Sequence, residues 1–114
     1  MSAARLAAKL VVQACIRAAE AKGLPATVLR RGDPDAGTIL LKALDRHGMA
    51  TLYTQARSPD GELGWRMAAG LAPAAESDVD ARIAREANID PDVWAVEVLD
   101  DERAHPLNPS LERD

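Results

Sequence analysis

Four short segments of strand-forming residues, separated by turn sequences, occupy the middle of this 114-residue chain. The segments are 26–31 (ATVLRR), 38–44 (TILLKAL), 49–56 (MATLYTQA) and 62–67 (ELGWRM). Glycine, proline and aspartate are frequent in the intervening turns, where they favour reversals of the chain. Since short connections join antiparallel neighbours, the pattern predicts an antiparallel meander in which 62–67 is an edge strand.

Residues 3–22 precede these strands and are predicted to form a helix, because they contain strong helix formers and neither glycine nor proline. Gly23 and Pro25 would end this helix. One side of the helix is apolar and is expected to pack on the sheet: Ala8, Val11, Val12, Cys15 and Ala19.

A second helix is predicted from a sequence resembling a capping box, Ser77 to Asp80, up to about Ala87. Val79 and Ile83 would lie on its buried side. Residues 92–99 (DVWAVEVL) alternate between apolar and polar positions and predict a last strand, in which the large ring of Trp94 is a core residue.

The element order is therefore α-β-β-β-β-α-β. This order predicts an α+β fold with an antiparallel sheet of four to five strands and two helices packed mainly on one face. Length favours a single domain over residues 1–100, followed by a polar and flexible tail over residues 101–114.

Composition limits the size of the core and indicates the cellular compartment. Alanine accounts for 23 residues and the larger apolar types for only 31, so little area is buried per apolar residue. The single cysteine excludes an intrachain disulfide and a multi-cysteine zinc site. No apolar run is long enough to span a membrane, and the N-terminus lacks a clean cleavage signal, so we expect a cytoplasmic protein.

The charges are unevenly distributed. Residues 1–31 carry six basic side chains and one acidic one, a balance of +5, whereas residues 76–114 carry twelve acidic and four basic ones, a balance of -8. A basic front can bind nucleic acid or a nucleotide. The two ends of the chain can equally lie together and neutralise each other.

The segment from Arg30 to Gly37 contains the strongest candidates for a binding site, namely Arg30, Arg31, Asp33 and Asp35. Two arginines could bind an anion and two carboxylates could contribute to a metal site. The structural alternative is a β-turn in which the aspartates accept hydrogen bonds from nearby backbone amides and the arginines pair with acids. We favour the structural alternative.

Trp65 and Arg66 are the first candidates for a protein interface. Both lie on the predicted edge strand beside glycine, and tryptophan and arginine are common in interface hot spots. We expect the Trp65 ring to be the more exposed of the two tryptophans.

No set of residues predicts catalysis, a metal site or a cofactor. Cys15 lies on the apolar side of a helix, where a buried thiol is inert. His47 falls in a turn and His105 in the tail, so neither is placed for base catalysis. The element order resembles that of metal-dependent nucleases, but the strand around Lys42 lacks the acid that such chemistry requires.

Two motifs give a resemblance to a known family: RRGDPDAG at residues 30–37, and Ile83-Ala84-Arg85 followed by DPDVWAVEV at residues 90–98. Together they are similar to a family of small bacterial proteins known as domain of unknown function 1491, over roughly residues 6 to 100. The resemblance implies one compact α+β domain of cytoplasmic bacterial origin. It implies no activity, cofactor or catalytic residue.

The leading functional hypothesis is a non-enzymatic module that self-associates or binds a bacterial protein partner. The first alternative is nucleic-acid or nucleotide binding through the basic N-terminal third: Arg5, Lys9, Arg17, Arg30 and Arg31. A further alternative is a metal- or anion-binding enzyme that uses the segment from Arg30 to Gly37.

Overall fold

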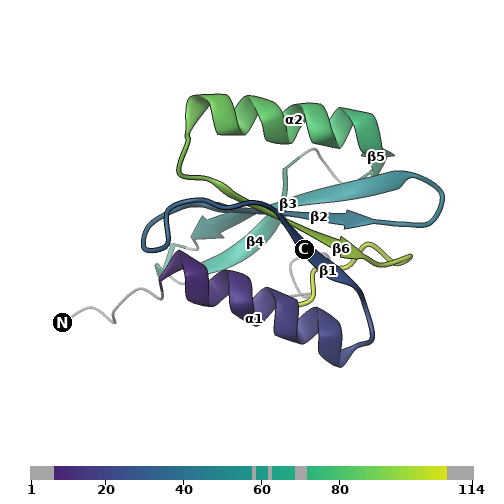
Figure 1. The fold of residues 1–114 in the computed structure, drawn as a ribbon, viewed down its shortest axis with the longest axis horizontal. Helices are drawn as coiled ribbons and strands as arrows, with labels where there is room; N and C mark the ends of the chain where they lie inside the picture. Colours follow the sequence, from purple (N-terminus) through teal and green to yellow (C-terminus); the bar gives the residue numbers. More distant parts are fainter. Residues whose placement is uncertain (1–6, 58, 62, 69–71, 108–114) are drawn as a thin grey trace.

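The computed structural model describes residues 7–57, 59–61, 63–68 and 72–107 of the chain. Two helices, α1 (Ala8–Ala21) and α2 (Glu76–Ile89), lie on opposite sides of one sheet and give the molecule three layers (Figure 1). Neither of these helices is long and apolar enough to cross a membrane. The predicted α+β class and the order of the main elements are confirmed.

Six strands form the sheet: β1 (Ala26–Arg30), β2 (Ile39–Leu44), β3 (Met49–Arg57), β4 (Leu63–Met67), β5 (Ala74–Ala75) and β6 (Trp94–Leu99). Their order is β1-β6-β2-β3-β4, and the short β5 pairs with β3. β4 is an edge strand, as predicted. β5 adds a strand to the predicted four or five, because a two-residue strand leaves no periodic pattern in a sequence.

The largest difference from the prediction concerns β6, which lies between β1 and β2. It pairs antiparallel with β1 and parallel with β2, so the sheet is mixed and β1 and β2 are not neighbours. The predicted antiparallel meander is confirmed for β2, β3 and β4. Its extension to β1 was wrong, because the short connection between β1 and β2 was taken to join neighbouring strands. β6 is buried along most of its length, and a central position is the one that covers both faces of such a strand.

Each face of the sheet has its own hydrophobic core. Ile39 and Leu41 of β2 pack with α1 on one side, whereas Leu40 of the same strand packs with α2 on the other. The expectation that both helices pack mainly on one face was therefore wrong. Because β2 has large apolar residues at successive positions, apolar side chains project from both faces of the sheet, and each face needs a helix to bury them.

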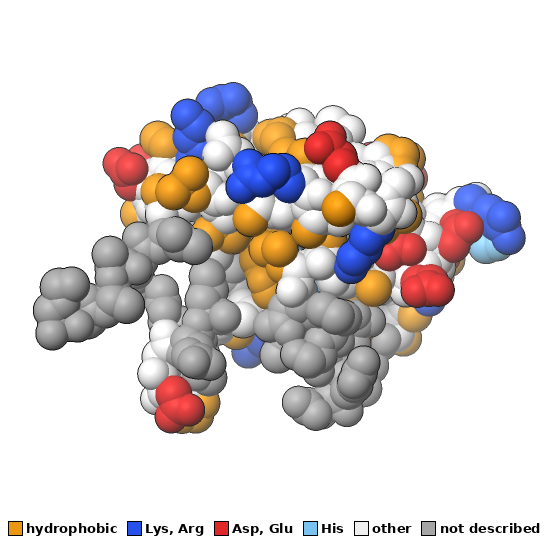
Figure 2. All heavy atoms as spheres, turned by 90° about the horizontal axis from the view of Figure 1, so that it is seen from below, with side chains coloured by type: hydrophobic (Ala, Val, Ile, Leu, Met, Phe, Trp, Pro, Cys, Tyr) orange, Lys and Arg blue, Asp and Glu red, His pale blue; other side chains and the backbone are white. Residues whose placement is uncertain are grey.

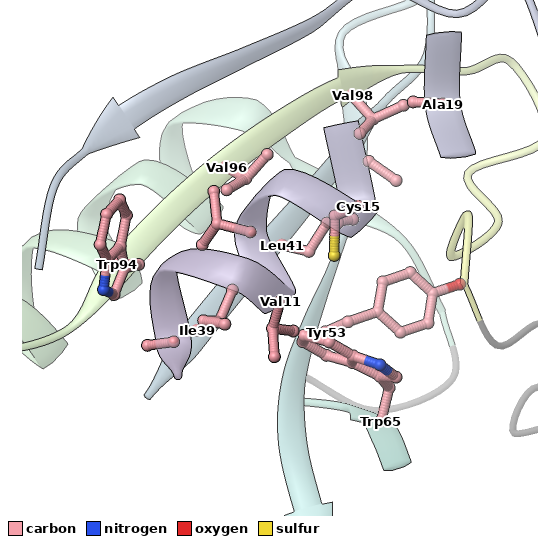
Figure 3. Packing of buried hydrophobic residues seen from close by; sticks show 13 residues of the cluster. Val11, Cys15, Ala19, Ile39, Leu41, Tyr53, Trp65, Trp94, Val96 and Val98 are labelled. Carbon is pink, nitrogen blue, oxygen red and sulfur yellow. The ribbon is translucent and has the colours of Figure 1, made fainter. Parts of the chain in front are cut away.

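The buried side of α1 is the predicted one. All five residues expected there are buried: Ala8, Val11, Val12, Cys15 and Ala19. Figure 3 shows Val11 and Cys15 facing the side chains of Leu41 and Tyr53 on the sheet. Trp94 is also buried, as predicted for a core residue.

The start of α2 differs from the predicted capping box. Ala75 is the N-cap residue and makes no side-chain capping bond. Asp80 instead accepts a hydrogen bond from Lys42 on the sheet. The tertiary partner therefore replaces the local one that the sequence indicated.

Residues 101–107 were expected to belong to a flexible tail, but they lie against the sheet. His105 is fully buried, and its ring centroid lies 4.1 Å from that of Trp65 and 5.2 Å from that of Tyr53. The Tyr53 hydroxyl donates a hydrogen bond of 2.7 Å to the carbonyl oxygen of Arg103. The polar composition of this segment suggested exposure to water. The His105 ring nevertheless packs on the aromatic rings of Tyr53 and Trp65, because imidazole is itself an aromatic ring. Residues 108–114 lie outside the described residues.

Two isoleucines of α2 provide a matched test of this packing. Ile83→Ala removes a side chain from the α2-side core, so we expect the free energy of unfolding to fall by about 2–4 kcal/mol. Ile89 is 81% exposed, and Ile89→Ala should change stability by less than about 0.5 kcal/mol. Urea unfolding followed by circular dichroism measures both. Equal losses in the two variants would contradict the observed placement of α2.

Candidate functional site

The segment from Arg30 to Gly37 folds as a loop whose polar groups bond to the protein itself. The Asp33 carboxylate accepts hydrogen bonds from the backbone amides of Asp35 at 3.0 Å and Ala36 at 2.8 Å. The backbone carbonyl oxygen of Asp33 accepts a hydrogen bond of 2.7 Å from the indole nitrogen of Trp94. Its own backbone amide donates to the carbonyl of Asp92 at 2.9 Å. Asp33 therefore joins the loop to the start of β6.

The same loop holds the first turn of α1. The carbonyl oxygens of Pro34 and Asp35 accept hydrogen bonds from the backbone amides of Lys9 and Ala8. These amides lack partners within the helix, because the first turn of any helix leaves its N–H groups unpaired. The loop therefore caps α1 with backbone carbonyls, where the sequence contains no suitable capping side chain.

Glycine is required at both ends of this loop by a close approach of two backbones. A Cβ atom placed at Gly32 or at Gly37 would collide with the carbonyl oxygen of Asp92, and it would also meet the indole ring of Trp94. The loop consequently crosses the entrance of β6 at backbone contact distance.

The two arginines contact different groups near the start of β6. Arg30 donates a hydrogen bond of 2.9 Å from Nη2 to the carbonyl oxygen of Pro91. The Arg31 guanidinium lies over the ring of Trp94, 5.7 Å from its centroid, which is a cation–π geometry. A register shift in the β1–β6 pairing falls between Val28 and Arg30.

The four candidates of the loop therefore do not converge. Asp35 is exposed, Asp33 is bonded to backbone amides, Arg30 is bonded to the Pro91 carbonyl and Arg31 lies over the Trp94 ring. Within the described ranges, no group of three or more histidine, cysteine, aspartate or glutamate side chains is arranged to hold a metal ion. The hydrogen bonds of Asp33 agree with the structural alternative for this loop, whereas Arg30 and Arg31 contact a carbonyl oxygen and an aromatic ring in place of the acids expected there.

Trp65 and Arg66 lie on β4 with opposite environments. Trp65 is only 3% exposed and packs in the α1-side core, so the expectation that its ring is exposed was wrong. His105 covers it, and this cover could not be expected while the tail was assumed to be free. Arg66 is exposed.

The structure also reveals a charged cluster that the sequence analysis missed. Lys42, in the middle of β2, is buried, and its Nζ lies 2.7 Å from both Glu76 and Asp80 of α2. Glu97 of β6 is the third carboxylate, at 3.1 Å. The signal that could have found the cluster is a lysine within the most apolar strand together with two acids four residues apart on the second helix.

The cluster fixes Lys42 as an ammonium ion. Burial by itself would lower the pKa of Lys42, but hydrogen bonds to Asp80, Glu76 and Glu97 outweigh burial and raise the pKa above its usual value. A lysine of this kind does not serve as a nucleophile or a general base, which need the neutral amine. Its contacts instead tie α2 to β2 and β6.

The remaining nucleophile and base candidates are placed as follows. Burial raises the pKa of the Cys15 thiol to about 12, so this residue stays protonated and unreactive. His47 is exposed in the turn between β2 and β3. His105 is buried against the rings of Tyr53 and Trp65. No two of these groups are shown bonded to each other in the part of the chain that the structure describes.

Basic residues of the N-terminal third are spread over the surface and the loop. Lys9 and Arg17 are exposed on α1, and Lys22 donates a hydrogen bond to the carbonyl oxygen of Pro106. Figure 2 shows the α1 side of the molecule, where lysine and arginine side chains form separate groups among hydrophobic and acidic ones. Arg5 lies outside the described residues.

The close approach at the loop predicts a large effect of a small substitution. Gly37→Ala should lower the free energy of unfolding by at least about 3 kcal/mol, because the new methyl group requires the loop to separate from β6. Gly48→Ala is the control, since this turn glycine has open space around it and a φ of +82. The control should lose only about 1–2 kcal/mol through backbone strain. Similar losses in thermal unfolding of the two variants would refute the close approach.

The Lys42 cluster predicts that the stability of the protein depends on the positive charge of Lys42. Lys42→Met leaves three carboxylates close together without a counter-charge, and because Glu76 and Asp80 are partly exposed to water we expect a loss of about 1–3 kcal/mol in the free energy of unfolding at pH 7. Arg46→Met removes an exposed ion pair with Asp101 and should cost less than about 1 kcal/mol. Urea unfolding measures both variants. A Lys42→Met variant as stable as the control would contradict the role assigned to the cluster.

Comparison with known proteins agrees with the resemblance noted in the sequence. The family described as protein of unknown function (DUF1491) matches residues 6–108. A crystal structure of a DUF1491 family protein from Caulobacter crescentus CB15 is 43% identical, with a TM-score of 0.82, covering 91% of this chain and 96% of that one. An NMR structure of a DUF1491 family protein from the same organism is 42% identical, with a TM-score of 0.79, covering 93% and 96%.

A third solved structure, of a protein from A. tumefaciens, is 29% identical with a TM-score of 0.79, covering 94% of this chain and 96% of that one. No match was found among curated proteins. None of these names states an activity. The match over nearly the whole chain shows that this protein belongs to the DUF1491 family of proteins of unknown function.

Proposed function

We propose that the protein is a non-catalytic module that self-associates through the edge strand β1. The observation that supports this proposal is the exposure of a large apolar side chain, Leu29, on that edge strand. Leu29 of β1 is 45% exposed and Leu99 of the adjacent β6 is 43% exposed. Leu29 lies beside Val96 and Ala95, whereas Leu99 lies beside Pro25 at the other end of the β1–β6 pairing, so Leu29 is the apolar side chain that a partner strand would meet.

Both leucines lie outside the part of the sheet that α2 covers. Val98 packs in the α1-side core, so its chain neighbour Leu99 points to the other side. Leu29 lies at the register shift between Val28, which packs on the α1 side, and Arg30, which pairs with Ala95 of the α2-side core. On the α2 side, the helix packs mainly on β2, β3 and β5. The helix therefore covers the middle of the sheet and leaves Leu29 of β1 and Leu99 at the end of β6 partly in water.

The backbone of β1 provides the second half of the argument. β1 lies at the end of the strand order and pairs with β6, which leaves its outer edge open for another strand within the described sheet. An open edge is a template for pairing with another chain. When two copies of β1 pair antiparallel, Arg30 of one copy faces the start of the other strand and not its Arg30. Like charges are thereby kept apart.

The expected dimer is weak. A five-residue strand and two partly exposed leucines bury less surface than a standard interface, so the dissociation constant should be roughly micromolar or larger. Association should therefore depend on concentration. No step of this function requires a metal, a cofactor or a reactive side chain.

The experiment is sedimentation velocity of the full chain from about 10 μM to 1 mM, a range suited to weak dimers. We expect the wild type to shift from monomer to dimer. Leu29→Lys should remain a monomer, because a lysine on an edge strand opposes pairing. Leu10→Lys is the matched control: Leu10 is 48% exposed but lies on α1, and this variant should still dimerise.

A wild type that stays monomeric over the whole range would refute self-association. Loss of the dimer in both lysine variants would show that general surface hydrophobicity, and not the β1 edge, causes association. Because Leu29 and Leu10 are similarly exposed, their lysine variants should lose similar stability as monomers. Thermal unfolding tests whether both variants are folded.

A further inference from the structure

The C-terminal segment 103–107 covers two aromatic side chains of the sheet. Tyr53 of β3 and Trp65 of β4 are both buried, and the His105 ring lies against both of them. Figure 3 shows the Tyr53 hydroxyl pointing toward this segment, with the Trp65 ring close to that of Tyr53. α1 covers the neighbouring part of the same face, so the segment completes the layer that α1 begins.

Three polar contacts anchor the segment. The Tyr53 hydroxyl donates to the carbonyl oxygen of Arg103, and Lys22 Nζ donates to that of Pro106 at 3.2 Å. The Arg103 guanidinium pairs with Asp45 at 2.6 Å. Arg103 also has a φ of 54, which is an uncommon conformation for a residue other than glycine. The segment is thus held by side-chain contacts and begins at a residue with a sterically costly backbone.

The hydrogen bonding of His105 defines its protonation state. The backbone amide of Leu107 donates to Nδ1 of His105 at 3.0 Å, so Nδ1 must act as an acceptor. The neutral ring consequently carries its proton on Nε2. A second proton would bind to Nδ1, remove this hydrogen bond and place two N–H groups against each other.

The surroundings of the ring also oppose a positive charge. Lys22 at the end of α1 and Arg103 of the segment itself are cations, and Tyr53 and Trp65 are neutral. Asp45 is the one carboxylate among the groups named here, and Arg103 already pairs with it. Burial and then the charge of Lys22 lower the pKa of His105 to about 3.

We propose that residues 103–107 are an acid-released cover over Tyr53 and Trp65, and that protonation of His105 at Nδ1 is the trigger. In the released state the imidazolium reaches water, and the aromatic face of β3 and β4 beside α1 becomes accessible. This device does not depend on the proposed association through β1, which lies at the opposite edge of the sheet.

The direction of the pH effect follows from the two protonation states. A histidine in water titrates near pH 6.5, and the docked ring titrates at about 3, so the docked state binds fewer protons between these values. Docking is therefore fully stable above about pH 6.5. It weakens by up to about tenfold for each pH unit below this value.

The experiment is hydrogen exchange of the full chain, measured by mass spectrometry from pH 7.5 to 4.5 and corrected for intrinsic exchange rates. This range lies above the usual pKa of about 4 for carboxylates. Hydrogen bonds from the backbone amides of Met49 and His47 and the pairing with Arg103 hold the pKa of Asp45 below its ordinary value. We expect the opening of a peptide containing residues 103–107 to increase about 50-fold between pH 6.5 and 4.5. Peptides from β2 and β6 should keep their protection.

Two variants separate His105 from other causes. His105→Phe retains a ring on Trp65 without a titrating nitrogen, and its opening should not change with pH. His47→Gln removes the exposed histidine and should behave as the wild type does. Acid-dependent opening that persists in His105→Phe would overturn the proposal, as would a wild-type peptide with constant protection.

A measurement on the wild type alone keeps the proposal testable if His105→Phe does not fold. The ring protons of His105 should show no titration in NMR spectra of the docked protein down to about pH 4.5, because the docked ring stays neutral. A midpoint near pH 6.5 with the segment still docked would contradict the proposal. Quenching of tryptophan emission by acrylamide should increase below pH 6 in the wild type and stay constant in His105→Phe.

Discussion

The insertion of β6 between β1 and β2 is the constraint on which the rest of the structure depends. It separates two strands that are consecutive in the sequence, so their connection must pass over the start of β6. Gly32 and Gly37 are the residues that make this passage possible, because any side chain there would meet the Asp92 carbonyl. The same loop caps α1. One crossing therefore positions a strand, a loop and a helix.

This constraint also explains the fate of the most suggestive sequence motif. Arg31 and Asp33 resemble parts of a ligand site when they are read along the chain. In the structure they bind Trp94, the first residue of β6, through the face of its ring and through its indole nitrogen. The motif thus has a structural role in this chain: it fastens the loop to the strand that it crosses.

Much of the local structure was accessible to sequence reasoning, while the two clusters around Lys42 and His105 were not. The period of α1 predicted its buried side correctly, because the contacts of a helix follow from its own geometry. Lys42 meets acids that lie 34, 38 and 55 positions away, and His105 meets Tyr53 from 52 positions away. No local pattern records such distances. Polar residues are assigned to the surface by composition, and these two are exceptions that their partners make possible.

The sequence by itself determined the α+β class, the positions of the main helices and strands, and membership of the family, because these depend on short-range periodicity, turn residues and motifs. Tertiary structure decided the order of the strands, the placement of the helices on opposite faces and the burial of Trp65 under the C-terminal segment. The physical reason is that burial is a property of the assembled sheet. An apolar strand such as β6 takes an interior position in the sheet, where both of its faces are covered, even though it comes last in the chain.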